Sequence, residues 1–444
     1  MQNNKRPNHS GRRRASGSSS FSRGGHSGSR STHSRGGTGH SRGASHARPY
    51  HAHGARGAHT AHRSSRSSGR RVAEMPKHDL SAFINKAAPT APEAPIVITH
   101  EFKDFAILPE LKTAIAKKGY VTPTPIQDQA IPHILKGTDV VGIANTGTGK
   151  TGAFLIPLVN AMLNDRRTRA LVIAPTRELA QQIEDEFRGF AKELRLFSVS
   201  CVGGAGIGRQ IGALRRMPHL VVGTPGRLKD LLERGAFTLD TFHAVVLDEA
   251  DRMLDMGFIN DMRLILGQLP EERQTLFFSA TLSPEIEKLI GEFLREPVRV
   301  SVKTRETAAS IEQDVVHIPA GTHKFDKLEE LLKQPGFGKV LVFGRTKHGV
   351  EKLAKTLVQR GFTCESIHGN KTQGQRQRAL DAFKRDRAQV LCATDVAARG
   401  LDISGVSHVI NYDLPATRED YVHRIGRTGR GGKQGKALTF IEAD

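Results

Sequence analysis

A glycine-rich run, Ala144-Asn-Thr-Gly-Thr-Gly-Lys-Thr151, places the strongest constraint on how this chain folds. It follows the apolar segment Asp139–Ile143 and precedes a helical pattern, which predicts a strand–loop–helix unit. In such a unit the glycines let main-chain N–H groups wrap a phosphate, and the helix N-terminus adds its positive end. The alternative is a glycine-rich turn before a helix, which the flanking segments disfavour.

The residue types of this loop predict particular contacts with a nucleotide. Lys150 is expected to reach the β- and γ-phosphates, and the Thr151 hydroxyl to ligate Mg²⁺. The candidate nucleotide-binding residues are Ala144, Asn145, Thr146, Gly147, Thr148, Gly149, Lys150 and Thr151.

A second set of candidates follows the apolar run His243–Leu247. It is Asp248-Glu-Ala-Asp251, and a carboxylate at the end of a buried strand is where a further Mg²⁺ contact belongs. We expect Asp248 to hold the metal through water, and Glu249 to orient and deprotonate an attacking water. The alternative is a solvated acidic turn. The position of the motif, about 100 residues after a phosphate loop, argues against that alternative. The run Gly203–Gly208 lacks dinucleotide spacing and is not expected to open a strand–turn–helix unit.

Short apolar runs alternate with helical patterns from residue 101 onward, which predicts α/β domains with parallel sheets covered on both faces. The polar stretch Val302–Gln313 interrupts this alternation and is interpreted as a linker. We therefore predict domains at 101–302 and 313–444, joined by a linker at 303–312. The expected strands are Asp139–Ala144, Ala170–Ala174, Leu220–Gly223, Ala244–Leu247 and Thr275–Phe278, then Lys339–Phe343, Thr363–Ile367, Val390–Ala393, His408–Asn411 and Lys436–Ile441.

Charge is distributed unevenly along the chain. The net charge is +21, and residues 1–71 hold 15 of the 66 lysines and arginines and no acid. The other 51 cations face all 45 acids, so the rest of the chain carries only +6. Residues 1–71 are rich in Gly, Ser, Arg and His, which predicts a disordered arm, and residues 72–100 form a connector. The arm indicates a polyanionic partner, nucleic acid before membrane, with a solubility role as the alternative.

Several classes of protein are excluded by composition. No apolar run approaches the ~20 residues of a membrane span. Three widely spaced cysteines, Cys201, Cys364 and Cys392, fit neither a disulfide framework nor a zinc site and indicate a reducing compartment. There is no secretory signal, and the arm lacks the apolar residues of an amphipathic transit peptide. We expect a cytoplasmic protein without a membrane partner.

Two further motifs complete a pattern that resembles one family. Ser279-Ala-Thr281 and His423-Arg-Ile-Gly-Arg-Thr-Gly-Arg430 follow the phosphate loop and the acidic motif in order. Together they look like a DEAD-box ATP-dependent RNA helicase of superfamily 2, over residues 101–444. The resemblance implies two tandem RecA-like parallel-sheet domains and the cofactors ATP and Mg²⁺. It also implies RNA-stimulated hydrolysis of ATP to ADP and phosphate, coupled to local unwinding of short duplexes or to ribonucleoprotein remodelling, by a monomer.

The resemblance assigns roles around the nucleotide. Phe102, Tyr120 and Gln127 match the element that reads adenine, and Asp402 matches a ribose contact. Arg427 and Arg430 match arginine fingers for the γ-phosphate, where a planar cation suits a transferring phosphoryl group. The resemblance also implies that four residues couple the ATP site to the RNA site: Ser279, Thr281, Asp251 and His423.

The resemblance also assigns RNA contacts that read backbone rather than sequence. In the first domain they are Pro175, Thr176, Arg177, Gly204, Thr224, Gly226 and Arg227, and in the second Gly369, Gln373, Arg376 and Thr394. Two positions depart from the family pattern: Asn145 stands where Gln or Glu is more frequent, and Phe343-Gly-Arg-Thr346 is an atypical form of its motif.

Two other functions stay open at this level. A DNA-directed translocase would use the same pair of ATP-binding domains, although the Gln127 element and the Asp-Glu-Ala-Asp motif argue against this function. An ATP-gated RNA clamp or scaffold would bind without turnover, yet Glu249, Arg427 and Arg430 are all present. Ribosome assembly, mRNA turnover and cold-stress remodelling are all compatible with the resemblance, and ribosomal or other ribonucleoprotein assemblies are candidate partners.

Overall fold

The computed structural model describes residues 97–302, 311–398, 403–429 and 434–442. The predicted arm and nearly all of the connector lie outside these ranges, as do residues 303–310 of the linker. The described residues form two parallel β-sheets, one in each predicted domain. Across these ranges, no helix is both long enough and apolar enough to cross a membrane.

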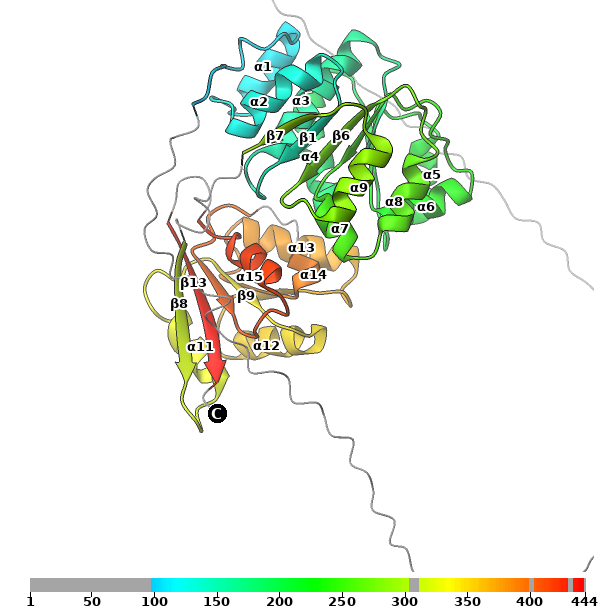
Figure 1. Ribbon diagram of the computed structural model, residues 1–444. Coiled ribbons are helices and arrows are strands. Elements are labelled where there is room, and N and C mark those ends of the chain that lie inside the picture. Colours follow the sequence, from blue (N-terminus) through cyan, green and yellow to red (C-terminus); the bar gives the residue numbers. More distant parts are fainter. Residues whose placement is uncertain (1–96, 303–310, 399–402, 430–433, 443–444) are drawn as a thin grey trace, which may run out of the picture. The chain divides into compact units, whose positions relative to one another are not determined.

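The first sheet has seven strands in the order β3-β4-β2-β5-β6-β1-β7. Figure 1 labels β7, β1 and β6, which lie next to one another in it. Successive residues point to opposite faces, so Val140 joins the core on one face and Val141 the core on the other. Burial on both faces explains the continuous apolar runs of the central strands. The strands are β1 (Val140–Ile143), β2 (Ala170–Ile173), β3 (Ser198–Cys201), β4 (Leu220–Gly223), β5 (Ala244–Leu247), β6 (Gln274–Ser279) and β7 (Val298–Ser301).

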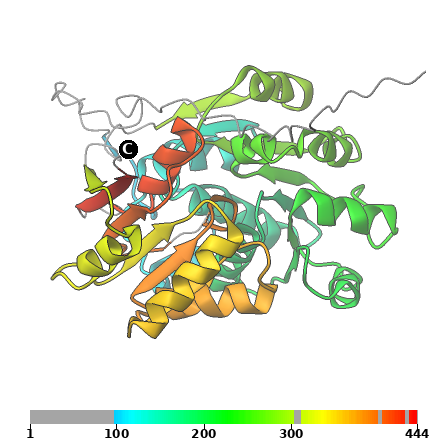
Figure 2. The ribbon, with the colours of Figure 1, turned by 90° about the horizontal axis from the view of Figure 1, so that it is seen from below.

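Helices cover both faces of this sheet (Figure 2). One core is closed by α1 (Pro109–Lys117), α2 (Pro125–Leu135), α3 (Lys150–Asn164) and α4 (Arg177–Ala191). The other is closed by α5 (Ile207–Leu214), α6 (Pro225–Glu233), α7 (Ala250–Asp255), α8 (Ile259–Leu266) and α9 (Pro284–Phe293).

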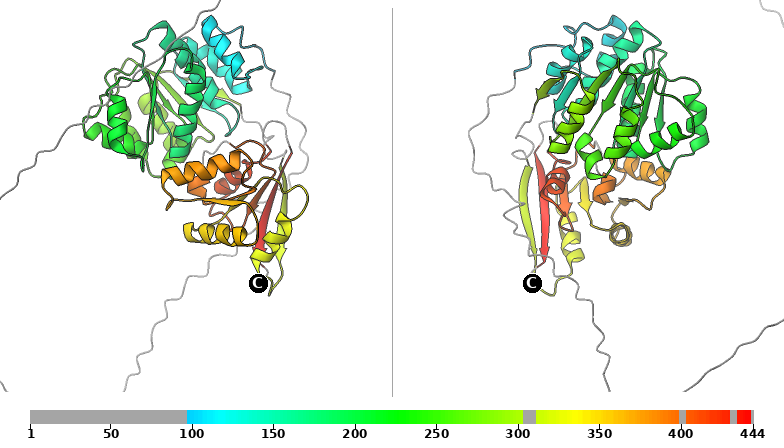
Figure 3. Two further views of the ribbon diagram at one scale, coloured as in Figure 1. Left: turned by 180° about the vertical axis from the view of Figure 1, so that it is seen from behind. Right: turned by 45° about the vertical axis from the view of Figure 1, so that its right-hand side comes forward.

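The second sheet has six parallel strands in the order β10-β11-β9-β12-β13-β8. In Figure 3, β13 and β8 run side by side, paired over eight residues. The strands are β8 (Ile311–Ile318), β9 (Val340–Phe343), β10 (Cys364–Ile367), β11 (Val390–Ala393), β12 (His408–Asn411) and β13 (Gly435–Glu442). The helices are α11 (Lys324–Leu332), α12 (Lys347–Gln359), α13 (Gln373–Lys384), α14 (Asp395–Ala398) and α15 (Arg418–Ile425).

The parallel, doubly covered sheets confirm the predicted fold class, and each predicted strand corresponds to an observed one. Three strands were not predicted: β3, β7 and β8. Each lies at the edge of its sheet and is partly exposed, so it lacks a continuous apolar run. Two expectations are wrong as a result. Ile311–Gln313 belong to β8 rather than to a linker, and Gly203–Gly208 does open a strand–turn–helix unit, between β3 and α5.

The close packing behind the phosphate loop predicts a stability effect at Gly142, in the middle of β1. A Cβ atom on Gly142 would lie 2.5 Å from Cε1 of Phe278, which is fully buried. We expect Gly142→Ala to lower the free energy of unfolding by about 1–3 kcal/mol through overpacking, measured by urea denaturation. The control is Gly291→Ala in α9, where a Cβ meets nothing within 4 Å. It should leave stability unchanged or raise it by up to about 1 kcal/mol, and equal losses in the two variants would contradict the packing argument.

Candidate functional site

The candidate residues of the first domain gather at the carboxyl edge of its sheet. All seven strands run in the same direction, so the loops that follow them lie at one edge, where ligands bind in open α/β folds. Main-chain hydrogen bonds join the loops to each other. The N–H of Ala144 donates to the carbonyl of Ser279 over 3.0 Å, and the N–H of Asp248 donates to the carbonyl of Ile173 over 3.0 Å.

The phosphate loop closes on itself. Gly149 has φ of 93°, and a Cβ there would lie 2.7 Å from Nε2 of Gln127, so both the backbone and the space require glycine. Lys150, the first residue of α3, is only 6% exposed and donates from Nζ to the carbonyl of Ala144 over 2.8 Å. The Thr148 hydroxyl donates to the carbonyl of Asn145 over 2.7 Å. The lysine therefore already points inward along the loop.

Two buried carboxyl groups face this loop from the end of β5. Asp248 is 2% exposed, and burial raises its pKa to about 7. Glu249 has left-handed backbone angles (φ 51°, ψ 50°) at the start of α7, uncommon for a residue with a side chain. Its Oε1 accepts from the Thr146 hydroxyl over 3.2 Å, and its buried Oε2 has no hydrogen-bond partner among the described residues. A buried carboxylate oxygen without a donor is costly, which marks this as a place for a ligand.

The acidic motif is bonded to the Ser279–Thr281 turn. Oδ2 of Asp251 accepts from the N–H groups of Ala280 and Thr281 and from the Thr281 hydroxyl, over 3.0–3.1 Å. The Ser279 hydroxyl accepts from the Asp251 N–H over 3.3 Å and donates to the Thr281 carbonyl over 2.8 Å. Three of the four residues predicted to couple the two sites thus form one network.

The predicted adenine-reading residues lie next to the phosphate loop. Gln127 is 2% exposed, and its amide is bonded on both sides: Oε1 accepts from the Thr124 N–H and Nε2 donates to the Gly149 carbonyl, each over 3.0 Å. The Tyr120 hydroxyl donates to Glu186 over 2.6 Å, and its ring packs edge-on to Phe102 with centroids 5.7 Å apart. Contact of these residues with adenine stays a prediction.

The predicted RNA contacts of the first domain also share this edge. Thr176 caps α4, accepting from the Leu179 N–H over 3.2 Å, and Pro175 is buried beside it. The guanidinium of Arg177 lies against Gly204, where φ is 76°, and burial lowers the pKa of that arginine. Arg227 donates to the Gln210 side chain over 3.0 Å at the start of α6, where Thr224 and Gly226 also lie. The structure brings these separate loops together, and their contact with RNA stays a prediction.

The second domain offers its candidates at the carboxyl ends of its strands and on two helices. Gly369 follows β10 and Thr394 follows β11, while Gln373 and Arg376 lie in the first turn of α13. Arg427 is 3% exposed and donates from Nε to the carbonyl of His423, in α15, over 3.2 Å. Asp402 and Arg430 lie outside the described residues, so their predicted roles have no structural account.

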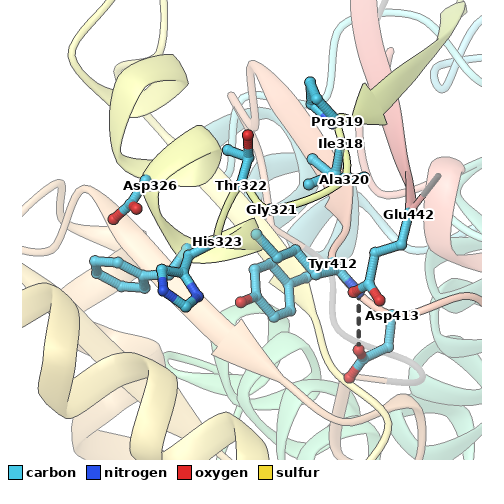
Figure 4. A pocket seen from close by; sticks show the side chains of 12 residues that line it. Ile318, Pro319, Ala320, Gly321, Thr322, His323, Asp326, Tyr412, Asp413 and Glu442 are labelled. Carbon is cyan, nitrogen blue, oxygen red and sulfur yellow. Dashed lines mark hydrogen bonds and ion pairs between the residues drawn. The ribbon is translucent and has the colours of Figure 1, made fainter. Parts of the chain in front are cut away.

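A cavity of about 720 Å³ in the second domain lies elsewhere (Figure 4). It opens between the turn from β8 to α11 and the ends of β12 and β13, with His323, Tyr412 and Glu442 among the side chains that line it. Lys324 pairs there with Asp413 and Glu442 over 3.4 and 3.2 Å. None of the candidate site residues within the described ranges lines this cavity.

Comparison with known proteins identifies the family. Residues 124–289 match the DEAD/DEAH box helicase family, and residues 323–432 match the helicase conserved C-terminal domain. The DEAD-box ATP-dependent RNA helicases CshA of Bacillus subtilis and Bacillus licheniformis are each 49% identical over 346 residues, which is 78% of this chain and 70–71% of theirs. The chain belongs to the DEAD-box helicase family.

Solved structures agree with this assignment. S. cerevisiae Dbp5 bound to RNA and ADP-BeF3 is 30% identical, with a TM-score of 0.69 over 78% of this chain and 90% of that one. Mss116 bound to single-stranded RNA and UDP-BeF is 31% identical, with a TM-score of 0.70 over 77% of this chain and 74% of that one. Both share the two RecA-like domains of this DEAD-box helicase.

Two residues that hold parts of the helicase site in place were not predicted from the sequence. Arg424, which is 2% exposed, pairs through Nη2 with Asp395 over 2.8 Å and donates to the Asn411 side chain over 3.1 Å. This ties α15 to α14 and to β12. Glu351 in α12 accepts from the Ser366 hydroxyl over 2.7 Å and from His368 Nε2 over 3.0 Å, which fixes the chain just before Gly369. Arg424 belongs to a quoted motif, but Glu351 carries no sequence signal.

The Glu351 contacts predict a pH dependence of stability. Hydrogen bonds from His368 and then Ser366 lower the Glu351 pKa from 4.5 to about 2. Because the folded pKa lies below the unfolded one, this stabilisation is complete above about pH 4.5 and is lost as the pH falls toward 2. Glu351→Gln should cost about 1–2 kcal/mol at pH 7, and progressively less below pH 4.5, in urea denaturation. Glu330→Gln, which removes an exposed pair with Lys327, is the control. A pH-independent loss would contradict the argument.

Proposed function

We propose that this helicase carries out ATP-dependent RNA unwinding, the activity of its family, with ATP held by the first domain and arginines supplied by the second. The observation that carries the proposal is the joining of the phosphate loop, the acidic motif and the Ser279–Thr281 turn at one sheet edge. The similar structures of Dbp5 and Mss116 hold RNA together with nucleotide analogues, which supports the same use of this edge.

Mg²⁺ fits the residues present. A buried carboxyl group and a helix N-terminal hydroxyl lie beside the phosphate loop, and one or two such oxygen ligands suit a cation that keeps waters and binds through substrate phosphates. The buried Asp248 carboxyl and the Thr151 hydroxyl at the start of α3 would hold it. When bound, Mg²⁺ neutralises charge on the β- and γ-phosphate oxygens. A nearby cation also offsets the burial that keeps the pKa of Asp248 high.

The chain's own residues then divide the chemistry. Lys150 leaves the Ala144 carbonyl and takes up the phosphates, while Gln127 and the aromatic residues Phe102 and Tyr120 select adenine. Glu249 orients the attacking water and accepts its proton. Arg427 and Arg430 belong to the second domain, as does Asp402 for the ribose. The catalytic set is therefore complete only when the two domains close on ATP.

RNA contacts are divided between the domains in the same way, so RNA favours the same closed state. Coupling between ATP and RNA binding must then be reciprocal. The residues that couple them are Asp251, Ser279, Thr281 and His423. Contacts to phosphates and 2′-hydroxyls select RNA over DNA with little sequence preference. Closure bends one strand in a way that a duplex cannot follow, which separates short duplexes locally.

The sequence also supports a proposal about location, oligomeric state and substrates. We propose a cytoplasmic monomer without a membrane partner, which acts on single strands, short duplexes or ribonucleoprotein assemblies, including ribosomal ones. The arm of residues 1–71, with 15 cations and no acid, adds a sequence-independent tether to RNA.

Replacement of the general base tests the proposed chemistry. We expect Glu249→Gln to lower kcat by about 10²–10⁴ while ATP binding is kept, because the amide cannot accept the proton. The control is Glu233→Gln, at an exposed position near the end of α6. Steady-state ATPase and nucleotide affinity report the two effects, and an unchanged kcat removes Glu249 from the mechanism.

Nucleic-acid stimulation of the ATPase tests the proposed substrate. We expect single-stranded RNA to stimulate turnover and matched DNA to do so weakly, because 2′-hydroxyl contacts are lost. The stimulation should persist in a chain shortened to residues 97–444. Equal stimulation by DNA would favour a general translocase. RNA binding without turnover would favour an ATP-gated clamp.

A further inference from the structure

The amino edge of the first sheet, opposite the loops described above, collects arginines from three separate segments. Residues 165–169, 193–197 and 215–219 lead into β2, β3 and β4, which are neighbours in the order β3-β4-β2. These segments hold two acids, Asp165 and Glu193, against six cations: Arg166, Arg167, Arg169, Arg195, Arg215 and Arg216. The parallel register brings them to one edge.

Hydrogen bonds hold the three segments together. The N–H of Ala170 donates to the carbonyl of His219, and the N–H of His219 donates to the carbonyl of Phe197, each over 2.9 Å. Arg166 donates from Nη1 to the carbonyl of Leu194 over 2.7 Å. The cluster is therefore built on the rigid ends of strands.

Most of this charge is not neutralised by neighbours. In the ranges that the structure covers, Arg195, Arg215 and Arg216 are exposed and form no ion pair. Asp165 pairs with Arg167, whereas Glu193 pairs with Lys117 over 2.6 Å, away from the cluster. Asp240, beside the pocket, also interacts with Arg169, so three acids face the six arginines and the edge keeps a positive excess that attracts phosphates.

A pocket of about 230 Å³ opens within the cluster. Leu214, Met217, Phe237 and Phe242 supply apolar walls, and Arg169 and Thr241 supply polar groups. Arg169 donates from Nη1 to the Thr241 hydroxyl over 2.9 Å, whereas its buried Nη2 has no hydrogen-bond partner among the described residues. The pocket thus combines apolar walls with the Arg169 guanidinium and the Thr241 hydroxyl among its lining groups.

An exposed aromatic side chain lies in the same cluster. Phe197 is 65% exposed and stacks on His219, with ring centroids 6.1 Å apart and planes 27° apart. The Phe197 N–H donates to Nδ1 of His219 over 3.1 Å, which holds the imidazole in place. A large apolar ring at this exposure offers a surface on which a base can stack.

We propose that this amino edge is a second RNA-binding site, which takes a nucleobase in the pocket and backbone phosphates on the arginines around it. Guanidinium groups match phosphate oxygens in bidentate geometry, and aromatic groups stack bases without regard to sequence. RNA carries a planar base beside every backbone phosphate, whereas an acidic protein segment offers a ring only where it has an aromatic residue, so the pairing of pocket and arginines favours RNA. The site lies apart from the contact loops of the carboxyl edge, so it goes beyond the proposed function.

Graded RNA lengths test the proposal on the full chain. Strands of four residues span only about 13 Å, so a long RNA can reach both edges of the sheet. The variant is Arg195→Gln/Arg215→Gln/Arg216→Gln. The matched control, Lys288→Gln/Lys352→Gln/Arg385→Gln, removes three exposed cations elsewhere. Binding to labelled single strands of about 8 and about 30 nucleotides is measured by anisotropy against salt, the shorter being near one site size.

We expect the variant to bind the long RNA about tenfold more weakly at low salt, with a logarithmic salt slope shallower by about 2. Binding of the short RNA and its stimulation of the ATPase should be unchanged. Equal affinities of variant and control for the long RNA would overturn the proposal and leave an acidic protein as the ligand. Equal losses on both lengths would place these arginines on the ordinary RNA path instead.

Cross-linking locates the base independently of the charge variant. With RNA that contains 4-thiouridine, ultraviolet light should link the long strand to the peptides that carry Phe197, Met217 or Phe237. AMP should displace these links less than the same nucleotide concentration of unlabelled long RNA, because only RNA binds the pocket and the surrounding arginines together, whereas equal displacement would assign the pocket to free nucleotides. Links confined to the carboxyl-edge peptides would overturn the proposal.

Discussion

Parallel pairing of β5, β6 and β1 is the constraint on which the rest of the nucleotide site depends. These strands are neighbours in register, with Leu247 opposite Phe277 and Ile143 opposite Ser279. The acidic motif, the Ser279–Thr281 turn and the phosphate loop are therefore neighbours at one edge, in that order. A shift of a single residue in either pairing would turn buried side chains outward, so the hydrophobic core itself fixes the positions of the polar groups.

This order gives Ser279 a position between the two halves of the nucleotide site. Its carbonyl accepts from Ala144, at the start of the phosphate loop, and its hydroxyl accepts from the N–H of Asp251. Asp251 in turn holds Thr281. A change in the phosphate loop or in the acidic motif therefore reaches the same turn through hydrogen bonds, without passing through the apolar core. Such a contiguous network is a physical basis for coupling, provided that the turn has two arrangements.

The sequence predicted the central strands and the carboxyl-edge loops because both leave local signals. Buried parallel strands are continuous apolar runs, and phosphate loops need glycine at fixed places. Edge strands such as β3 leave no such signal, since alternate residues face solvent. Contacts between segments that are distant in the sequence leave no local signal either. The two bonds made by the Gln127 amide and the bonds from Ser366 and His368 to Glu351 depend on packing that no spacing rule records.

The clustering of charged residues also depends on the fold and cannot be predicted from the sequence. Outside the arm the chain carries only +6, a value that by itself predicts no particular basic surface. In a parallel sheet, however, all strands begin at one side and end at the other. The pairing that brings the motif residues together after the strands therefore also brings together the segments that precede the strands. Arg169, Arg195 and Arg215 are separated in sequence by 20 residues or more, yet they precede three adjacent strands. Their concentration is a property of sheet order, so it becomes visible only once that order is known.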